Sequence, residues 1–156
     1  MMRLIFIIAA LAAALSVMPS AQAAPLRASC ALNHAAVAVS TSSQSTASGN
    51  FVDVAESSIR FVQGGTKDGC IIVSLSAEAL ADVNAGMAVR VVLDGTTECE
   101  SSYSSFVKSD PSRSVRTANF LCTDVAPGAH RVKLQFSGNE GLVLLDVRTV
   151  TVQYFK

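Results

Sequence analysis

Three residues in this sequence have the types and spacing that acid–base chemistry uses. Glu98 and Glu100 flank Cys99, so on a strand their two carboxylates would face the same side. Paired carboxylates carry out glycoside hydrolysis, and carboxylates also bind calcium. His130 is a candidate general base. These residues define one hypothesis, a small hydrolase or lyase that uses Glu98, Glu100 and His130.

The surroundings of these residues favour structural roles instead. A working carboxylate pair needs a cleft and a controlled separation across it, and a pair on one solvated strand has neither. His130 begins a predicted strand, where bonding to a turn carbonyl is the simpler role, and His34 lies among small residues. A triad also needs a nucleophile, and the sequence has no G-x-S-x-G elbow. The sequence therefore assigns no catalytic residue.

The four cysteines suggest a different kind of chemistry. They are Cys30, Cys70, Cys99 and Cys122, spaced 40, 29 and 23 positions apart. Zinc sites use much shorter spacings, so we expect no metal, and no glycine-rich stretch has the lysine and helix of a nucleotide loop, so we expect no cofactor. An even number of cysteines in an oxidising compartment favours two disulfides.

Three disulfide pairings are possible. We expect Cys99 to pair with Cys122, because they lie on neighbouring predicted strands, and Cys30 to pair with Cys70, which would tie a polar N-terminal segment to the sheet. Each crosslink would stabilise the fold by about 3 to 4 kcal/mol in the chain-entropy model. A competing interpretation makes Cys30 the acylated cysteine of a lipoprotein, but Arg27 stands where that motif has an aliphatic residue.

The first 23 residues indicate the compartment. They combine a positive charge, an apolar run, a breaker pair and a small-residue motif, namely Arg3, Leu4 to Val17, Pro19-Ser20 and Ala21-Gln22-Ala23. This pattern predicts a secretory signal peptide, cleaved between Ala23 and Ala24. The apolar run is shorter than the roughly 20 residues that cross a bilayer, so we expect no membrane span after cleavage. The sequence thus predicts an exported protein, periplasmic or extracellular.

The mature chain divides into two expected parts. Residues 24–50 are rich in serine, threonine and alanine, and Ser40 to Asn50 predicts a flexible linker or long exposed loop. Within this part, Ala35 to Val39 predicts a weak edge strand. Residues 51–156 are expected to form one β-sandwich domain.

This second part alternates strands with turns. Apolar residues at every second position predict strands over 57–63, 70–75, 87–94, 114–125, 130–136 and 142–154. The first two would form a hairpin through Gly64 to Gly69, and Asp94-Gly95 predicts another tight turn. The last strand changes parity near Asp146 to Arg148, which predicts a bulge or two short strands.

Only Ser76 to Asn84 has a helix-like pattern. The sequence therefore predicts an all-β antiparallel sandwich, Ig-like or jelly-roll, with about seven to nine strands and at most one short helix.

Four turn-plus-strand motifs support this fold. They are Gly69 to Val73, Val89 to Gly95, Val125 to Lys133 and Arg148 to Val152. Together, from about Phe51 to the end, they resemble those of small exported bacterial β-sandwich proteins, which are mostly uncharacterised. The resemblance implies the fold and export, and it brings no catalytic residue.

Composition narrows the function classes. The chain has 12 basic and 12 acidic residues, and loss of Arg3 leaves one acidic residue in excess, so no nucleic-acid or membrane partner is indicated. Tryptophan, the usual aromatic platform for sugars, is absent.

We therefore expect a non-enzymatic, envelope-associated or extracellular binding module with a protein or glycan partner. Tyr103, in a Ser/Tyr-rich loop suited to adaptable recognition, would form the contact surface with Phe106 and the outward Arg131 and Lys133. A secreted hydrolase or lyase is the alternative, and an assembly subunit is a third possibility.

Overall fold

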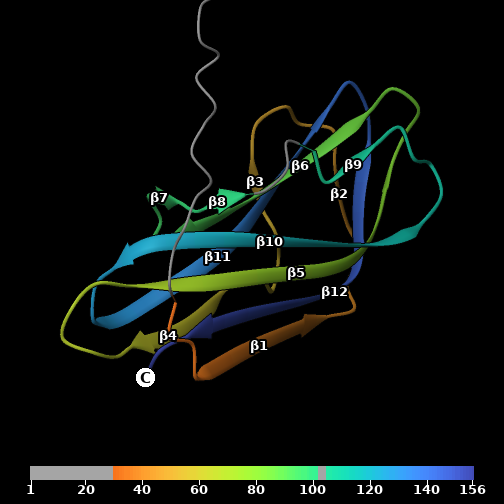
Figure 1. Cartoon of the computed structure of the whole chain (residues 1–156). Coiled ribbons are helices and arrows are strands. Elements are labelled where there is room, and N and C mark those ends of the chain that lie inside the picture. The colour runs from red at the N-terminus through yellow and green to blue at the C-terminus, as the bar shows by residue number, and fades with distance from the viewer. Residues whose placement is uncertain (1–29, 102–104) are drawn as a thin grey trace, which may run out of the picture.

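A computed structural model describes residues 30–101 and 105–156 (Figure 1). The described residues form twelve strands in two antiparallel sheets and no helix, which confirms the predicted all-β sandwich. The strand count exceeds the prediction because five of these strands are only two or three residues long. The predicted signal peptide, with its cleavage site between Ala23 and Ala24, lies outside the described residues.

The first sheet, sheet A, has β5 near its centre. Its strand order is β1(His34–Ser40), β12(Val143–Tyr154), β5(Gly69–Ala81), β10(Ser114–Val125) and β8(Glu100–Ser101), and β2(Gln44–Thr46) also pairs with β12.

The second sheet, sheet B, is built around β11. Its order is β3(Val52–Asp53), β11(Gly128–Asn139), β6(Gly86–Leu93) and β7(Thr97–Glu98), with β4(Ile59–Gln63) also beside β11 and β9(Val107–Lys108) beside β6.

The core lies between the inner faces of the two sheets. In β5 and β11 every second side chain points inward, because successive side chains of a strand face opposite sides. Val73 of β5 and Leu134 of β11 are both fully buried in this layer. At about 25 cal/mol per Å² of apolar surface removed from water, this layer is the main source of stability.

The helix-like pattern over Ser76 to Asn84 does not form a helix, because β5 continues through Ala81. Ala77 and Ala79 point into the core while Glu78 faces outward. Alanine favours helices in isolation, but here the segment is paired on both sides, with β10 and β12. Tertiary pairing therefore overrides the local preference.

Two further expectations are corrected by strand pairing. The turn Gly64 to Gly69 does not close a hairpin, because β4 pairs with β11 whereas β5 pairs with β10 and β12. It carries the chain from one sheet to the other. Within the expected linker Ser40 to Asn50, β2 pairs with β12, and the predicted edge strand is present as β1.

Other local predictions are confirmed. Asp94 and Gly95 have φ values of 51° and 84°, and the Thr96 amide donates to the Leu93 carbonyl at 3.2 Å, which describes a tight turn between β6 and β7. The predicted parity change near Asp146 to Arg148 is a register shift between Leu145 and Arg148.

Both predicted disulfides are present, Cys30–Cys70 and Cys99–Cys122. Because the Cys30 sulfur is bonded to Cys70, it has no thiol to acylate, and the lipoprotein interpretation is wrong. Two disulfides indicate an oxidising compartment outside the cytoplasm. The described residues contain no helix long and apolar enough to span a membrane.

Candidate binding surface

The predicted carboxylate pair is divided between the two sheets. Glu98 lies in β7 of sheet B, whereas Glu100 lies in β8 of sheet A. The chain crosses between the sheets at Cys99, which is buried and bonded to Cys122. The expectation that both carboxylates share one strand face is therefore wrong, and the Glu98 carboxylate instead lies 3.0 Å from Nη1 of Arg90.

Both ring nitrogens of His130 are engaged. Nδ1 lies 2.7 Å from Oδ2 of Asp94, and Nε2 lies 2.7 Å from the carbonyl oxygen of Ala126. The second contact is the expected bond to a turn carbonyl. Burial would lower the pKa of His130, but the bonds to Asp94 and Ala126 together raise it above 6.5. In its protonated form the ring donates both bonds, so both nitrogens are engaged in structural contacts.

The predicted contact surface is only partly present. Tyr103 lies outside the described residues. Phe106 is 8% exposed and belongs to the core, because its amide donates to the Met87 carbonyl at 2.8 Å and holds this segment along β6. Its expected exposure is wrong. Arg131 and Lys133 do lie on the outer side of β11, where Arg131 is exposed and Lys133 is half-buried.

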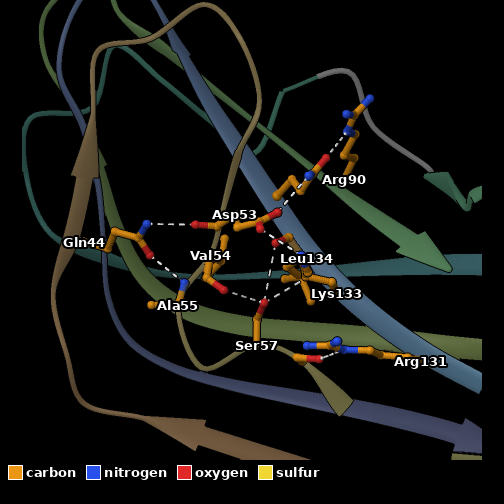
Figure 2. A network of polar contacts seen from close by, with 11 residues as sticks. Gln44, Asp53, Val54, Ala55, Ser57, Arg90, Arg131, Lys133 and Leu134 are labelled. Carbon is orange, nitrogen blue, oxygen red and sulfur yellow. Dashed lines mark hydrogen bonds and ion pairs between the residues drawn. The ribbon is translucent and has the colours of Figure 1, made fainter. Parts of the chain in front are cut away.

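Around these two residues the outer side of sheet B carries a chain of polar contacts (Figure 2). Asp53 accepts from Nζ of Lys133 and from Nε2 of Gln135, both at 2.8 Å. Gln135 in turn accepts from Nε of Arg90 at 2.8 Å, and Arg90 pairs with Glu98. The contacts thus cross β3, β11, β6 and β7.

This part of the face is electrically balanced. The two cations Arg90 and Lys133 meet the two carboxylates of Glu98 and Asp53. The hydrogen bonds from Gln135 and Lys133 lower the pKa of Asp53, so it is ionised at neutral pH. A balanced, mutually bonded group of this kind is expected to orient side chains rather than to attract a charged partner.

Next to it lies an unbalanced pair of cations. Arg60 of β4 is directly opposite Arg131 of β11, and both are exposed. Nε of Arg131 donates to Oγ of Ser58 at 2.5 Å, which is a neutral partner. Arg60 makes no side-chain hydrogen bond or ion pair with the described residues. We call Arg60 and Arg131 the arginine pair.

Two carboxylates lie near the arginine pair, and both are held by other groups. Asp53 is bonded to Gln135 and Lys133, and these bonds lower its pKa more than the nearby charge of Arg131 does. Oδ2 of Asp94 contacts His130, and Oδ1 accepts from the backbone amide of Arg131 at 2.8 Å. The charge of Asp94 is thus shared with the His130 ring, whose raised pKa favours its cationic form. Neither guanidinium of the arginine pair forms an ion pair with a carboxylate of the described residues.

Arg131 also separates two shallow depressions in the surface. One is lined by Val92, Asp94, Gly95, Arg131, Lys133 and Gln135. The other is lined by Arg60, Phe61, Val62, Ala129, His130 and Arg131. A partner that contacts Arg131 would therefore have room on both sides of it.

Sequence reasoning identified Arg131 and Lys133 but missed Arg60. The missing information was strand pairing, because β4 was expected to pair with β5 and its true partner is β11. The alternation of Arg60 with buried Ile59 and Phe61 shows that it faces outward. It does not show which residue lies opposite.

No protein-family model matches the sequence, and no curated protein sequence matches it. Among solved structures, the chain is similar to dimeric latent PorU from Porphyromonas gingivalis, with 15% identity and a TM-score of 0.47, over 80% of this chain and 13% of that one. It is also similar to a family two carbohydrate esterase from Cellvibrio japonicus, with 17% identity and a TM-score of 0.29, over 78% of this chain and 34% of that one. Both TM-scores are below 0.5, and neither likeness carries an inference about function.

Proposed function

We propose that the chain is an exported, non-enzymatic binding module of the periplasm or cell exterior, and that the arginine pair binds an anionic partner. The observation that carries this proposal is the cross-strand position of Arg60 and Arg131. Residues directly opposite on antiparallel strands have Cβ atoms about 5 Å apart, and like charges there destabilise a sheet. A bound anion would remove that repulsion.

Arginine also has the geometry for this role. Its planar guanidinium presents several N–H donors in a fixed fork that matches a carboxylate. Two such groups on adjacent strands can hold two carboxylates of one polymer, with Lys133 and Gln135 beside them in the neighbouring depression. The contacts of Glu98, Glu100 and His130 give no support to the hydrolase or lyase alternative.

The charge of the whole chain limits what the partner can be. Acidic and basic residues are equal in number in the sequence, so its net charge does not favour a polyphosphate chain. A partner with a few carboxylates close together, in a protein or in an acidic glycan, fits the two cations of the arginine pair better.

Binding to two immobilised acidic polymers, compared with one uncharged polymer, tests the proposal. The oxidised chain from residue 24 onward is passed over polyglutamate, polygalacturonate and uncharged dextran at low salt, and then eluted with a salt gradient. We expect the chain to be retained on one of the two acidic polymers, and that polymer shows whether the partner's carboxylates belong to a protein or to a glycan. The bound chain should be released as salt screens the charge contacts. Arg60→Ala and Arg131→Ala should each elute earlier.

Lys67→Ala is the matched control, because it removes one exposed charge from the Gly64 to Gly69 turn and leaves sheet B unchanged. It should elute with the wild type. If neither acidic polymer retains the chain, or if the two arginine variants elute with the wild type, the proposal is wrong.

A further inference from the structure

The free side of β1 is a second surface of interest. All seven residues of β1, His34 to Ser40, pair with β12. Among the described residues no strand pairs with the other side of β1, which lies at the border of sheet A (Figure 1). An edge strand of this kind presents unpaired N–H and C=O groups and can accept a further strand.

This edge lacks the features that usually block strand addition. β1 contains no proline, lysine or carboxylate, and Val37 and Val39 are 58% and 65% exposed. By contrast, each of the other strands that has a neighbouring strand on just one side contains a charged residue, with one exception. These are β3 with Asp53, β4 with Arg60, β7 with Glu98, β8 with Glu100 and β9 with Lys108.

The exception is β2, which is covered. The side chain of Gln44 donates to the Asp53 carbonyl at 2.9 Å and accepts from the Ala55 amide at 2.7 Å, so the chain around residue 54 lies against this strand (Figure 2). At the end of β1, Oγ of Ser40 donates to Glu56 at 2.6 Å. Before Ser40 the outward-facing Val37 and Val39 are exposed, although β1 also lies close to β4 of sheet B.

We propose that β1 pairs with β1 of a second copy of this chain, in antiparallel orientation, so that two copies of sheet A form one continuous sheet. In a two-fold arrangement with Val37 opposite Val37, Ala35 of each copy lies opposite Val39 of the other. These residues share the outer face of the sheet, so apolar side chains meet and no like charges are brought together.

Charge favours a second copy over a charged peptide as the occupant. The strand next to β1 places Thr149 and Thr151 opposite Val39 and Val37, so the outer face is uncharged over two strands. An uncharged edge is matched best by another uncharged edge, and the molecule itself supplies one. The proposal does not rest on the arginine pair, which lies in sheet B.

Mass measurement across a dilution series tests the proposal. The oxidised chain from residue 24 onward is examined by native mass spectrometry and by size exclusion with light scattering. We expect a dimer that dissociates to monomer on dilution. Val39→Lys puts an ammonium at the edge of both copies and should raise the dissociation constant by at least about tenfold, since 1.4 kcal/mol corresponds to tenfold.

Val83→Lys is the matched control, because Val83 is 68% exposed but lies in the turn between β5 and β6. It should dimerise like the wild type. Hydrogen exchange of the amides from Ala36 to Val39 should be slower in the dimer than in the monomer, and therefore slower at high protein concentration than at low concentration. In Val39→Lys the exchange rate should no longer depend on protein concentration.

Three outcomes would overturn the proposal. They are a wild-type chain that is monomeric at every concentration, a dimer that Val39→Lys leaves unchanged, and a dimer whose amides in β1 exchange as fast as in the monomer. If the wild-type chain is monomeric and yet binds a free peptide with the sequence of β1, the edge accepts strands but the second copy is the wrong occupant.

Discussion

Replacing Arg148 by methionine is expected to weaken the fold strongly. Arg148 is the largest fully buried side chain of the described residues, at 1% exposure. The bulge after Leu145 turns it inward, and its guanidinium reaches two loops outside β12. Nη1 donates to the Ser42 carbonyl at 2.6 Å, and Nη2 donates to the Ala55 carbonyl at 2.7 Å. Arg148 therefore ties the segments that flank β2 and β3 to sheet A.

The size of the effect follows from these contacts. Nη1 also donates to the Asp146 carbonyl at 3.2 Å, which makes three bonds from a charged donor. Such bonds contribute about 1.5–3 kcal/mol each, but the cost of burying the charge offsets part of their sum. Burial lowers the pKa of Arg148, although the negative charges of Glu56 and Asp146 act in the opposite direction. Arg148→Met leaves these three carbonyl acceptors without a donor, and since an unsatisfied buried group costs about 1–3 kcal/mol, we expect a total loss of about 3–5 kcal/mol.

Urea unfolding followed by far-ultraviolet circular dichroism measures this loss, since the chain has no tryptophan. Arg116→Met is the matched control, because Arg116 pairs with Asp110 and its side chain is 44% exposed. A surface pair of this kind contributes little to stability. If Arg148→Met costs no more than Arg116→Met, the assigned role of Arg148 is wrong.

Three further predictions concern the disulfide, the turn and the histidine. Replacing Cys99 and Cys122 by alanine should cost about 3 kcal/mol or more in urea unfolding, because a crosslink over 23 positions is lost and its buried sulfurs leave space; an equal midpoint for both proteins would refute this. Gly95→Ala should cost about 1 kcal/mol in thermal unfolding, because its φ of 84° disfavours a side chain, and an unchanged midpoint would contradict the turn. The raised pKa of His130 means that its charged form stabilises the fold fully below pH 6.5 and that this contribution is lost as pH rises through the raised pKa. His130→Gln should therefore flatten the pH dependence of the unfolding free energy in that window, and an unaltered dependence would show that Asp94 does not stabilise the charged ring.

Local patterns in the sequence predicted much of the fold. The alternation over Ser114 to Val125 gave the bounds of β10, and Asp94-Gly95 gave the turn after β6. Both depend on neighbouring residues, since strand periodicity and turn conformation are local properties. The cysteine count and strand positions also gave the two disulfides.

Strand partners were not predictable in the same way. Periodicity shows which side chains of a strand are buried, but it does not show which strand lies beside it. The position of Arg60 opposite Arg131 therefore required the structure. The same limit applies to Phe106, because an apolar residue in a serine-rich loop is buried only if that loop packs along β6.

A buried arginine was also not expected from the sequence. The parity change at Asp146 to Arg148 predicted the bulge, and after it Arg148 has the same parity as the buried Val150. Burying a guanidinium is costly unless carbonyl groups receive its hydrogens. Those carbonyls come from distant loops, at Ser42 and Ala55.

Charge reversal at Arg60 tests the binding proposal most directly. Arg60→Glu places a carboxylate opposite Arg131 and turns a repulsive cross-strand pair into an attractive one. We expect the variant to unfold at the same urea concentration as the wild type or a higher one, while its retention on the acidic polymer is lost. A variant that is retained as strongly as the wild type would contradict the account, because the arginine pair would then not be the surface that binds.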